Sequence, residues 1–350
     1  MRPFTAAIHS VGSRSYFMKQ ERFSLVRPLI KMLFSAVFVV GAGSLAFAQE
    51  QTIKSFTSPQ MAVNALIEAA RTDDVSSIVT LFGEGAEEWV RSGDEVQDEQ
   101  GRNEFVAAFE KKNGLEFDGD DSATLVVGDD DFPFAIPIVK TSEGWVFDAE
   151  AGKEELLNRR IGRNELNTIQ ALLAIADAQF DYAQEDRDGD GLREYATKFR
   201  SSEEKRDGLY WPTEDGEPAS PLGELVAEAS AEGYRGEKDV ETDDDGSGAY
   251  HGYRFKLVQR QGNNASGGAF DYVAAGSQIG GFAVIAHPVK YGVSGIMTLQ
   301  VNHDGVIYEA DLGDETEAIV ATMEEFNPGD EWGEVDPFDW QLAKDATTEQ

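Results

Sequence analysis

Between residues 51 and 150, apolar positions first repeat with a helical period and then alternate as they do in strands. The first predicted helix begins at Ser58, a plausible N-cap, with Pro59 at the first helical position and an apolar stripe behind it. A second short helix is predicted to begin at Asp73-Asp74. The remaining elements of this region are a third helix near 103–111 and strands at 123–127, 134–139 and 144–148.

The second half of the chain opens with a longer helical pattern. From Asn164 to Phe180 apolar residues recur at helical spacing, and the pattern breaks at the acidic stretch that begins with Glu185. Two further helices are predicted, at 192–200 and 222–231. The rest alternates like antiparallel strands, at 253–259, 269–274, 281–287, 296–301 and 306–310.

These patterns predict an α+β protein. N-terminal helices with an antiparallel sheet come first, followed by a long helix and a small antiparallel sheet. Within the second half, residues 235–249 are rich in Gly, Asp and Glu and predict a flexible acidic loop. We divide the chain into a signal peptide (1–48), an α+β domain (51–155), a second α+β domain (156–327) and an acidic disordered tail (328–350).

The first fifty residues predict export. A basic segment with Arg22, Arg27 and Lys31 leads into an apolar run at 32–41, and Ala46-Phe-Ala48 follows. This is the order of a secretory signal peptide, so we expect cleavage near Ala48 and a periplasmic or extracellular protein. An uncleaved membrane anchor is the alternative, but the run is short for a span of about 20 residues.

Composition narrows the chemistry. The 350 residues include no cysteine, which excludes disulfides, thiol catalysis and thiolate metal sites. The net charge is −35, and because residues 1–48 hold six basic and one acidic side chain, the remainder carries −40. Such a surface repels nucleic acid and anionic lipid. We therefore expect no nucleic-acid partner. The sequence has no second long apolar stretch, so we also expect no integral membrane segment after processing.

One acidic stretch has the spacing of a calcium loop. Asp186, Asp188 and Asp190 occupy its first, third and fifth positions, Gly191 the sixth, and Glu194 the ninth. The twelfth position lacks the usual glutamate, which departs from the pattern. These carboxylates predict a structural Ca²⁺ site of weak, extracellular type. The alternative is a solvated acidic turn in which an Asp caps the next helix.

Three arginines, Arg159, Arg160 and Arg163, form the one dense basic cluster after the signal peptide. They could bind an anionic ligand or seat the second domain on the first, and we favour the second interpretation. The three histidines after the signal peptide lack metal-binding spacing, and neither a nucleophile-elbow nor a phosphate-binding motif is present.

Several short motifs lie along the mature chain: Asn158-Arg-Arg-Ile-Gly-Arg-Asn-Glu-Leu166, Asp186-Arg-Asp-Gly-Asp-Gly191, Lys205-Arg-Asp-Gly-Leu-Tyr-Trp-Pro212, Tyr250-His-Gly-Tyr253, Gly280-Gly-Phe-Ala283, and His287-Pro with Tyr291-Gly-Val-Ser-Gly295. Through these motifs most of the mature chain, from about Phe56 to Asp330, resembles a bacterial secreted family, domain of unknown function family 2950. The resemblance implies no activity.

Each half also resembles a known fold. The helices and the Gly144-Trp-Val-Phe147 strand of the first half resemble the cone of nuclear-transport-factor-2-like domains. The long helix and sheet of the second half resemble the globular part of pilins and pseudopilins, through Ala178-Gln-Phe-Asp-Tyr182, Gly252-Tyr-Arg-Phe255 and Ser294-Gly-Ile-Met-Thr298.

We expect an envelope-associated binding or structural module without a catalytic role, whose partner is an envelope protein or a small ligand. Two alternatives stay open. One is a hydrolase that uses carboxylates in a cleft between the two domains, which a carboxyl pair with raised pKa would favour. The other is an accessory subunit of a pilus-like or secretion machine, which an exposed apolar face on the long helix would favour.

Overall fold

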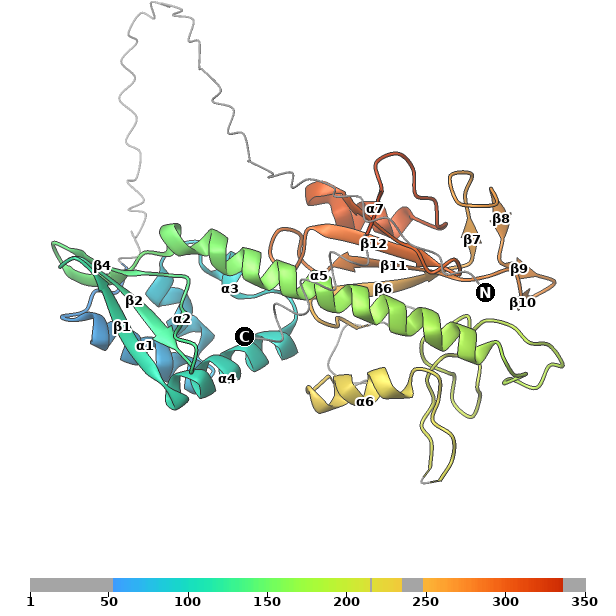
Figure 1. The fold of residues 1–350 in the computed structure, drawn as a ribbon, viewed down its shortest axis with the longest axis horizontal. Coiled ribbons are helices and arrows are strands. Elements are labelled where there is room, and N and C mark those ends of the chain that lie inside the picture. Colours follow the sequence, from blue (N-terminus) through green and yellow to red (C-terminus); the bar gives the residue numbers. More distant parts are fainter. Residues whose placement is uncertain (1–52, 215, 235–247, 336–350) are drawn as a thin grey trace, which may run out of the picture. The chain divides into compact units, whose positions relative to one another are not determined.

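A computed structural model describes residues 53–335, apart from residue 215 and residues 235–247 (Figure 1). The described residues all belong to one compact unit, Glu50–Gln350. Three sequence predictions lie outside them: the signal peptide, most of the acidic loop at 235–249, and residues 336–350 of the predicted tail. The structure confirms the α+β class, with helices and antiparallel sheets in both halves.

Four helices open the N-terminal half. The predicted cap of the first is confirmed, because Ser58 Oγ accepts a hydrogen bond from the Met61 amide at 3.3 Å. Asp74 caps the second in the same way, through the Ser77 amide at 3.0 Å. The helices are α1 (Pro59–Arg71), α2 (Val75–Phe82), α3 (Glu87–Val90) and α4 (Glu95–Lys111).

The N-terminal sheet is antiparallel, with strand order β1-β2-β4-β5 and β3 paired to β2. Its inner face carries Leu125, Ile138 and Phe147, each at most 1% exposed, and helices α1 to α4 contribute most of the rest of this core. Strand β1 was not predicted, because its residues are mostly exposed and carry little apolar pattern. The strands are β1 (Asn113–Asp118), β2 (Ser122–Val127), β3 (Phe132–Pro133), β4 (Ile138–Thr141) and β5 (Gly144–Phe147).

A single long helix, α5 (Ala149–Tyr182), runs along both halves of the described chain (Figure 1). Its first turns pack against the N-terminal core, and its residues from Ile169 onward pack against the C-terminal sheet. It begins well before Asn164, at an Asp148 cap, and its first turns lie directly on the N-terminal half. A Cβ at Gly152 would lie 2.3 Å from the Ala135 carbonyl oxygen, so only glycine permits this approach. The predicted domain boundary at 155/156 falls inside this helix, and the division into two domains stays a prediction.

The C-terminal sheet is also antiparallel, in the order β14-β13-β12-β11-β6. Four of its strands confirm the predictions, while the predicted strand at 269–274 is split into β8 and β9. Residues 333–334, inside the predicted tail, pair with β13 as β14. The strands are β6 (Tyr253–Val258), β7 (Arg260–Gln261), β8 (Phe270–Asp271), β9 (Val273–Ala274), β10 (Ser277–Gln278), β11 (Ala283–Pro288), β12 (Met297–Asn302), β13 (Ile307–Asp311) and β14 (Gly333–Glu334).

Two helices accompany this sheet. The predicted helix at 222–231 is confirmed as α6 (Gly223–Ala231), and α7 (Thr316–Thr322) lies near β11. One face of the sheet buries the apolar side of α5 from Ile169 to Tyr182, and the other face packs with a smaller cluster that includes Val320 of α7. The C-terminal half therefore has apolar cores on both faces of its sheet.

The predicted helix at 192–200 is wrong, because these residues run as irregular chain. Their backbone groups bond to distant partners instead of to one another. The amide side chain of buried Gln179 accepts from the Ala196 N–H and donates to its carbonyl, both at 2.9 Å. The Tyr195 N–H donates to the Gln278 carbonyl at 2.9 Å. Tertiary partners thus override the local helical pattern.

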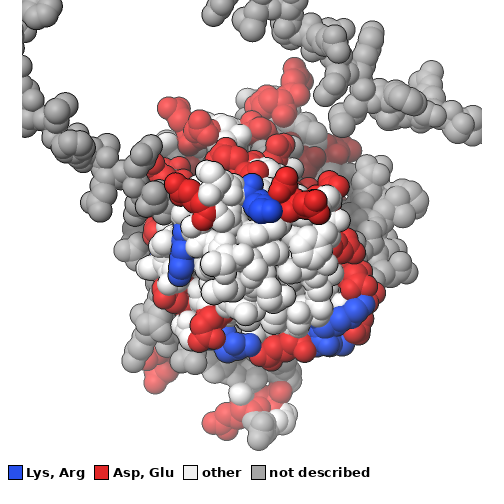
Figure 2. Space-filling model, turned by 90° about the vertical axis from the view of Figure 1, so that its left-hand side faces the viewer, with Lys and Arg blue, Asp and Glu red and all other residues white. Residues whose placement is uncertain are grey.

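Charge is unevenly distributed on the surface. Figure 2 shows the end of the molecule that holds the N-terminal helices and sheet, where uncharged side chains form a broad area bordered by acidic and basic ones. The large apolar side chains exposed in this half include Ile53, Met61, Phe117 and Phe132. None of the helices between residues 53 and 335 combines the length and the apolar character that crossing a membrane requires.

Candidate functional site

A cavity of about 280 Å³ lies in the N-terminal half, between the helices and the loop that follows β3. Its floor is buried and apolar, with Leu66, Ile78 and Trp89 exposed by 6% or less. Two lining residues, Gly101 of α4 and Arg163 of α5, are exposed and mark the mouth. A concave apolar site with a few polar groups at its entrance is the usual form of a small-molecule pocket.

Aromatic rings form much of the cavity wall. Phe82 stacks on Trp89 with ring centroids 5.4 Å apart, and Phe105 lies 5.2 Å from Phe134. Phe82 and Phe134 are also 6.4 Å apart, which links the two pairs into one cluster. These contacts hold the wall in place from four separate segments of the chain, so the cavity is supported by packing and not by one flexible loop.

Two of the three clustered arginines fasten α5 to the N-terminal half. Arg159 donates from Nη1 to the Pro133 carbonyl at 2.8 Å, and its guanidinium lies 4.5 Å from the Phe132 ring centroid. Arg160 donates from Nη1 to the Trp89 carbonyl at 2.8 Å. Both contacts fit the interpretation that these arginines hold the second half of the chain against the first. All three arginines nevertheless line the cavity, so the structure also leaves room for the anion-binding alternative.

The cavity contains one carboxylate, that of Asp98 on α4. Burial raises the pKa of Asp98, while a hydrogen bond from the Ser92 amide (2.9 Å) and the charges of Arg160 and Arg102 oppose the rise. The hydrolase alternative requires a pair of carboxyl groups that share a site. Among the lining residues that the structure describes, Asp98 has no such partner.

The loop after α5 brings three of the four predicted calcium ligands together. One carboxylate oxygen from each of Asp186, Asp188 and Asp190 lies within 4.8 Å of the others, and all three side chains are exposed. Glu194 is not part of this group, and its Oε2 accepts the Gln278 amide at 2.8 Å. Burial raises the pKa of Glu194, and the charges of Asp188 and Asp190 add to the rise.

The same carboxylates also shape the turn. Asp186 accepts hydrogen bonds from the amides of Gly189 (2.8 Å) and Gly191 (3.0 Å), and Asp190 accepts one from Leu192 (2.7 Å). Such bonds stabilise an acidic turn without a metal ion. The geometry therefore fits both the calcium interpretation and the solvated turn, and the calcium site stays a prediction.

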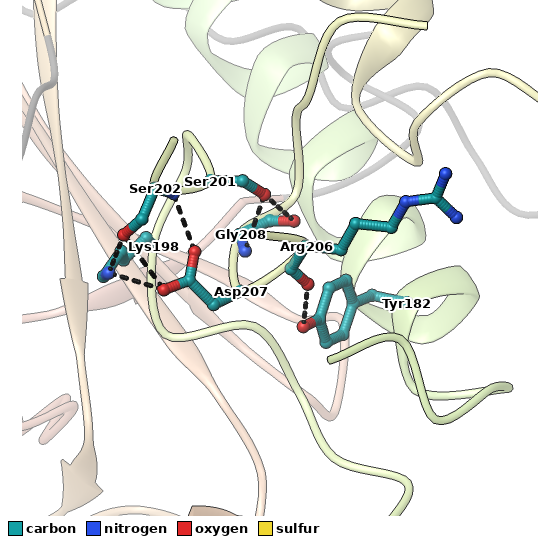
Figure 3. A network of polar contacts seen from close by, with 7 residues as sticks. All are labelled: Tyr182, Lys198, Ser201, Ser202, Arg206, Asp207 and Gly208. Carbon is teal, nitrogen blue, oxygen red and sulfur yellow. Dashed lines mark hydrogen bonds and ion pairs between the residues drawn. The ribbon is translucent and has the colours of Figure 1, made fainter. Parts of the chain in front are cut away.

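A polar network lies on the segment 198–208, which follows this acidic loop in the sequence (Figure 3). Asp207 accepts hydrogen bonds from the Ser202 amide at 2.7 Å and from Lys198 Nζ at 2.8 Å. Burial alone would raise the pKa of Asp207, but these hydrogen bonds outweigh it and lower the pKa to about 2. Nearby, the Tyr182 hydroxyl donates to the Arg206 carbonyl at 2.6 Å, which joins the network to the end of α5.

The apolar face of α5 is buried against its own sheet. Ile169, Leu172 and Ile175 are exposed by 6% or less and pack with β6, β11 and β12. Phe180 is 41% exposed but contacts Tyr195 and Phe282 through its ring. The accessory-subunit alternative would gain from an exposed apolar helix face, and the described part of α5 offers only Phe180.

The sequence pattern indicated the arginines but not the cavity itself. The third helix was predicted near 103–111, whereas α4 begins at Glu95 and supplies Asp98, Gly101 and Arg102 to the lining. No residue of α4 is fully buried, so its apolar stripe is weak and gave little periodic signal. Trp89, on the four-residue helix α3, also lacked a pattern that could place it in the wall.

Comparison with known proteins identifies the family. Neither a curated protein nor a solved structure matches this chain. The likenesses to nuclear-transport-factor-2-like domains and to pilins therefore stay predictions. A family model does match, and it covers residues 53–335, which is most of the chain and nearly the whole of the described region. The chain belongs to the family described as Protein of unknown function (DUF2950).

Proposed function

We propose that this protein is a non-catalytic, envelope-associated binding module that takes up a small apolar ligand in the cavity of its N-terminal half. The observation that carries the proposal is the cavity itself: about 280 Å³ walled by buried apolar and aromatic side chains. Binding of an apolar ligand removes such walls from water, which stabilises the complex by roughly 25 cal/mol for each Å² of apolar surface buried.

The titratable groups at the cavity favour binding over catalysis. General acid–base chemistry on a glycosidic bond needs two carboxyl groups, and among the described lining residues only Asp98 provides one. Arginines cannot serve as proton donors or acceptors near neutral pH, because they stay charged. They can hold and orient an anionic group, which is a binding role.

The envelope location rests on the segment before Gln49, with its basic residues, apolar run and Ala46-Phe-Ala48 site. Mass spectrometry of protein recovered from the bacterial periplasm tests this directly. A mature chain that begins at Gln49 supports export and cleavage. A chain that keeps residues 1–48 and sediments with membranes contradicts it.

A fluorescence titration tests ligand uptake. N-phenyl-1-naphthylamine is neutral and emits strongly only in apolar surroundings, so it reports entry into the cavity. We expect a saturable rise in emission with one site per chain, which the variant Gly101→Phe abolishes because its new ring fills the mouth. A linear, non-saturable rise, or a saturable one that Gly101→Phe leaves unchanged, would mean that the cavity is not the binding site.

The calcium loop is a second and separate proposal. Its support is the convergence of Asp186, Asp188 and Asp190 within 4.8 Å, which presents hard oxygen donors to a hard cation. The loop connects α5 to the irregular segment that follows, so an ion bound there would stabilise the C-terminal half and take no part in ligand uptake.

A further inference from the structure

The charge at the cavity mouth is opposite to that of the chain. The protein carries a net charge of −35, yet the cavity lining holds four arginines and a single carboxylate. The arginines are Arg102 on α4 and Arg159, Arg160 and Arg163 on α5. The lining therefore holds more cationic than anionic side chains, in a chain whose net charge is strongly negative.

Two of the four arginines already have carboxylate partners. Arg102 Nε lies 2.6 Å from Asp73 Oδ1, and Arg159 Nε lies 2.7 Å from Glu155 Oε1. Arg159 is further engaged by the Pro133 carbonyl. These two side chains are held in place by the protein, and their carboxylate partners offset much of their charge, so they offer little to a ligand at the mouth.

Arg160 and Arg163 are less completely neutralised. Arg160 donates to the Trp89 carbonyl at 2.8 Å; burial lowers its pKa, the Asp98 charge opposes that change, and the charge of Arg163 adds to it. Arg163 lies three residues further along α5, is exposed, and forms no ion pair with a carboxylate in the described chain. Like charges at this helical spacing repel each other, and an anion between them would relieve the repulsion.

The rest of the cavity suits an apolar body. Apart from the arginines and Asp98, its lining carries no titratable group, and the ring cluster of Phe82, Trp89, Phe105 and Phe134 supplies the deeper wall. Its volume, about 280 Å³, is near the lower end of the roughly 300–1,000 Å³ typical of small-molecule pockets. It therefore fits a single short chain or ring system better than a lipid with two acyl chains.

We infer that the ligand is an acidic amphiphile, whose apolar tail fills the aromatic cavity and whose carboxylate or phosphate head lies between Arg160 and Arg163. This inference rests on the proposed binding function and specifies its ligand class. Guanidinium groups bind such heads through paired, charge-assisted hydrogen bonds, and the low dielectric beside the cavity strengthens them.

Calorimetric titration of the chain from Gln49 to Gln350 with three probes of equal tail length tests the inference. The probes are decanoate, decanol and decyltrimethylammonium. We expect decanoate to bind about tenfold more tightly than decanol, since charge-assisted hydrogen bonds are worth about one decade of affinity or more. The cationic probe should bind most weakly, and added salt should weaken decanoate alone.

A matched pair of variants places the head group. Arg163→Gln should lower decanoate affinity by about tenfold and leave decanol binding unchanged. Arg193→Gln makes the same charge change at an exposed residue away from the cavity and should have no effect. Arg163 is exposed and unpaired in the described chain, so its replacement should not disturb folding, and Arg163→Lys should restore part of the affinity.

The outcomes separate this inference from the proposed function. If decanol and decanoate bind with equal affinity and Arg163→Gln changes neither affinity, the inference of an acidic head group is wrong. The proposed uptake of an apolar ligand is then still supported. If none of the three probes binds and N-phenyl-1-naphthylamine does not bind either, both the acidic ligand class and the uptake of an apolar ligand are contradicted.

Discussion

The buried carboxylate of Asp94 accepts a hydrogen bond from the hydroxyl of Tyr234 at 2.8 Å. The same oxygen accepts the Gly252 amide at 2.9 Å, and the other oxygen caps α4 through the Gln97 amide at 3.0 Å. Burial and the Asp94 charge raise the pKa of Tyr234, which keeps its hydroxyl a donor. One side chain thus fixes the helix that lines the cavity to two segments of the C-terminal half.

Removing this carboxylate should destabilise the fold more than an ordinary helix cap does. Asp94→Ala deletes the cap and leaves two buried donors without an acceptor, so we expect a loss of roughly 2–4 kcal/mol in the free energy of unfolding. Tyr234→Phe should cost about 1 kcal/mol. Asp74→Ala removes an exposed cap from α2 and should cost about 1 kcal/mol. Urea unfolding measures all three, and equal losses for Asp94→Ala and Asp74→Ala would refute the linking role.

The Asp207 carboxylate should make the free energy of unfolding depend on pH in the acidic range. Its folded-state pKa of about 2 lies below the unfolded value of about 3.9, so the carboxylate stabilises the fold above pH ~4 and loses this effect as the pH falls towards 2. Asp207→Asn should therefore cost roughly 1–2 kcal/mol at neutral pH, with the difference from wild type shrinking through that window.

Thermal unfolding at a series of pH values measures this difference for Asp207→Asn. Asp271→Asn, at an exposed carboxylate of β8, serves as the control for the general effect of removing one negative charge. A difference that stays constant from neutral pH to pH ~2 would show that the Lys198 and Ser202 contacts do not set the charge of Asp207.

Calcium should stabilise the wild-type chain if the acidic loop binds it. At roughly 10 mM Ca²⁺, a site of extracellular affinity adds about 1.4–2.7 kcal/mol to the free energy of unfolding, because the ion binds the folded state alone. Asp188→Ala should abolish the resulting rise in melting temperature, and a chelator should reverse it in the wild type. Identical melting of the wild type and Asp188→Ala with and without Ca²⁺ would leave the loop as a solvated turn.

The position of the domain boundary can be tested with two fragments. Residues 51–155 end before Leu156 and Leu157, which pack on the N-terminal core, and before the two arginines that bond to the carbonyls of Trp89 and Pro133. A fragment of residues 51–163 keeps these contacts. We expect the longer fragment to unfold cooperatively at a higher urea concentration, measured by circular dichroism. Equal stability would place the boundary at 155, as sequence patterning suggested.

Local signals predicted the parts of the fold that depend on local physics. Ser58 and Asp74 act as caps because their side chains reach amides three residues ahead, which is visible in sequence. The alternation of Tyr253, Phe255 and Leu257 in β6 reflects their packing in the core shared with α5, which sequence also records. The end of α5 at Tyr182, just before the acidic loop, follows from the same kind of signal.

The failures arose where distant contacts decide the structure. Residues 192–200 have a helical pattern, but Gln179 and Gln278 take up their backbone groups. The start of α5 at Ala149 depends on the close approach at Gly152 to Ala135, which no local pattern reveals. The cavity was missed for the same reason, since its wall joins α1, α2, α3, α4, α5 and the loop after β3.

The most direct measurement of the central claim compares uptake of N-phenyl-1-naphthylamine by Gly101→Phe and Gly162→Phe. Both glycines are helical, and an added Cβ at either meets no atom within 4 Å, so both variants should fold and gain helix stability. Gly101 lines the cavity and Gly162 does not. We predict that Gly101→Phe loses saturable binding while Gly162→Phe binds as the wild type does. Equal binding by the two variants would contradict the cavity as the ligand site.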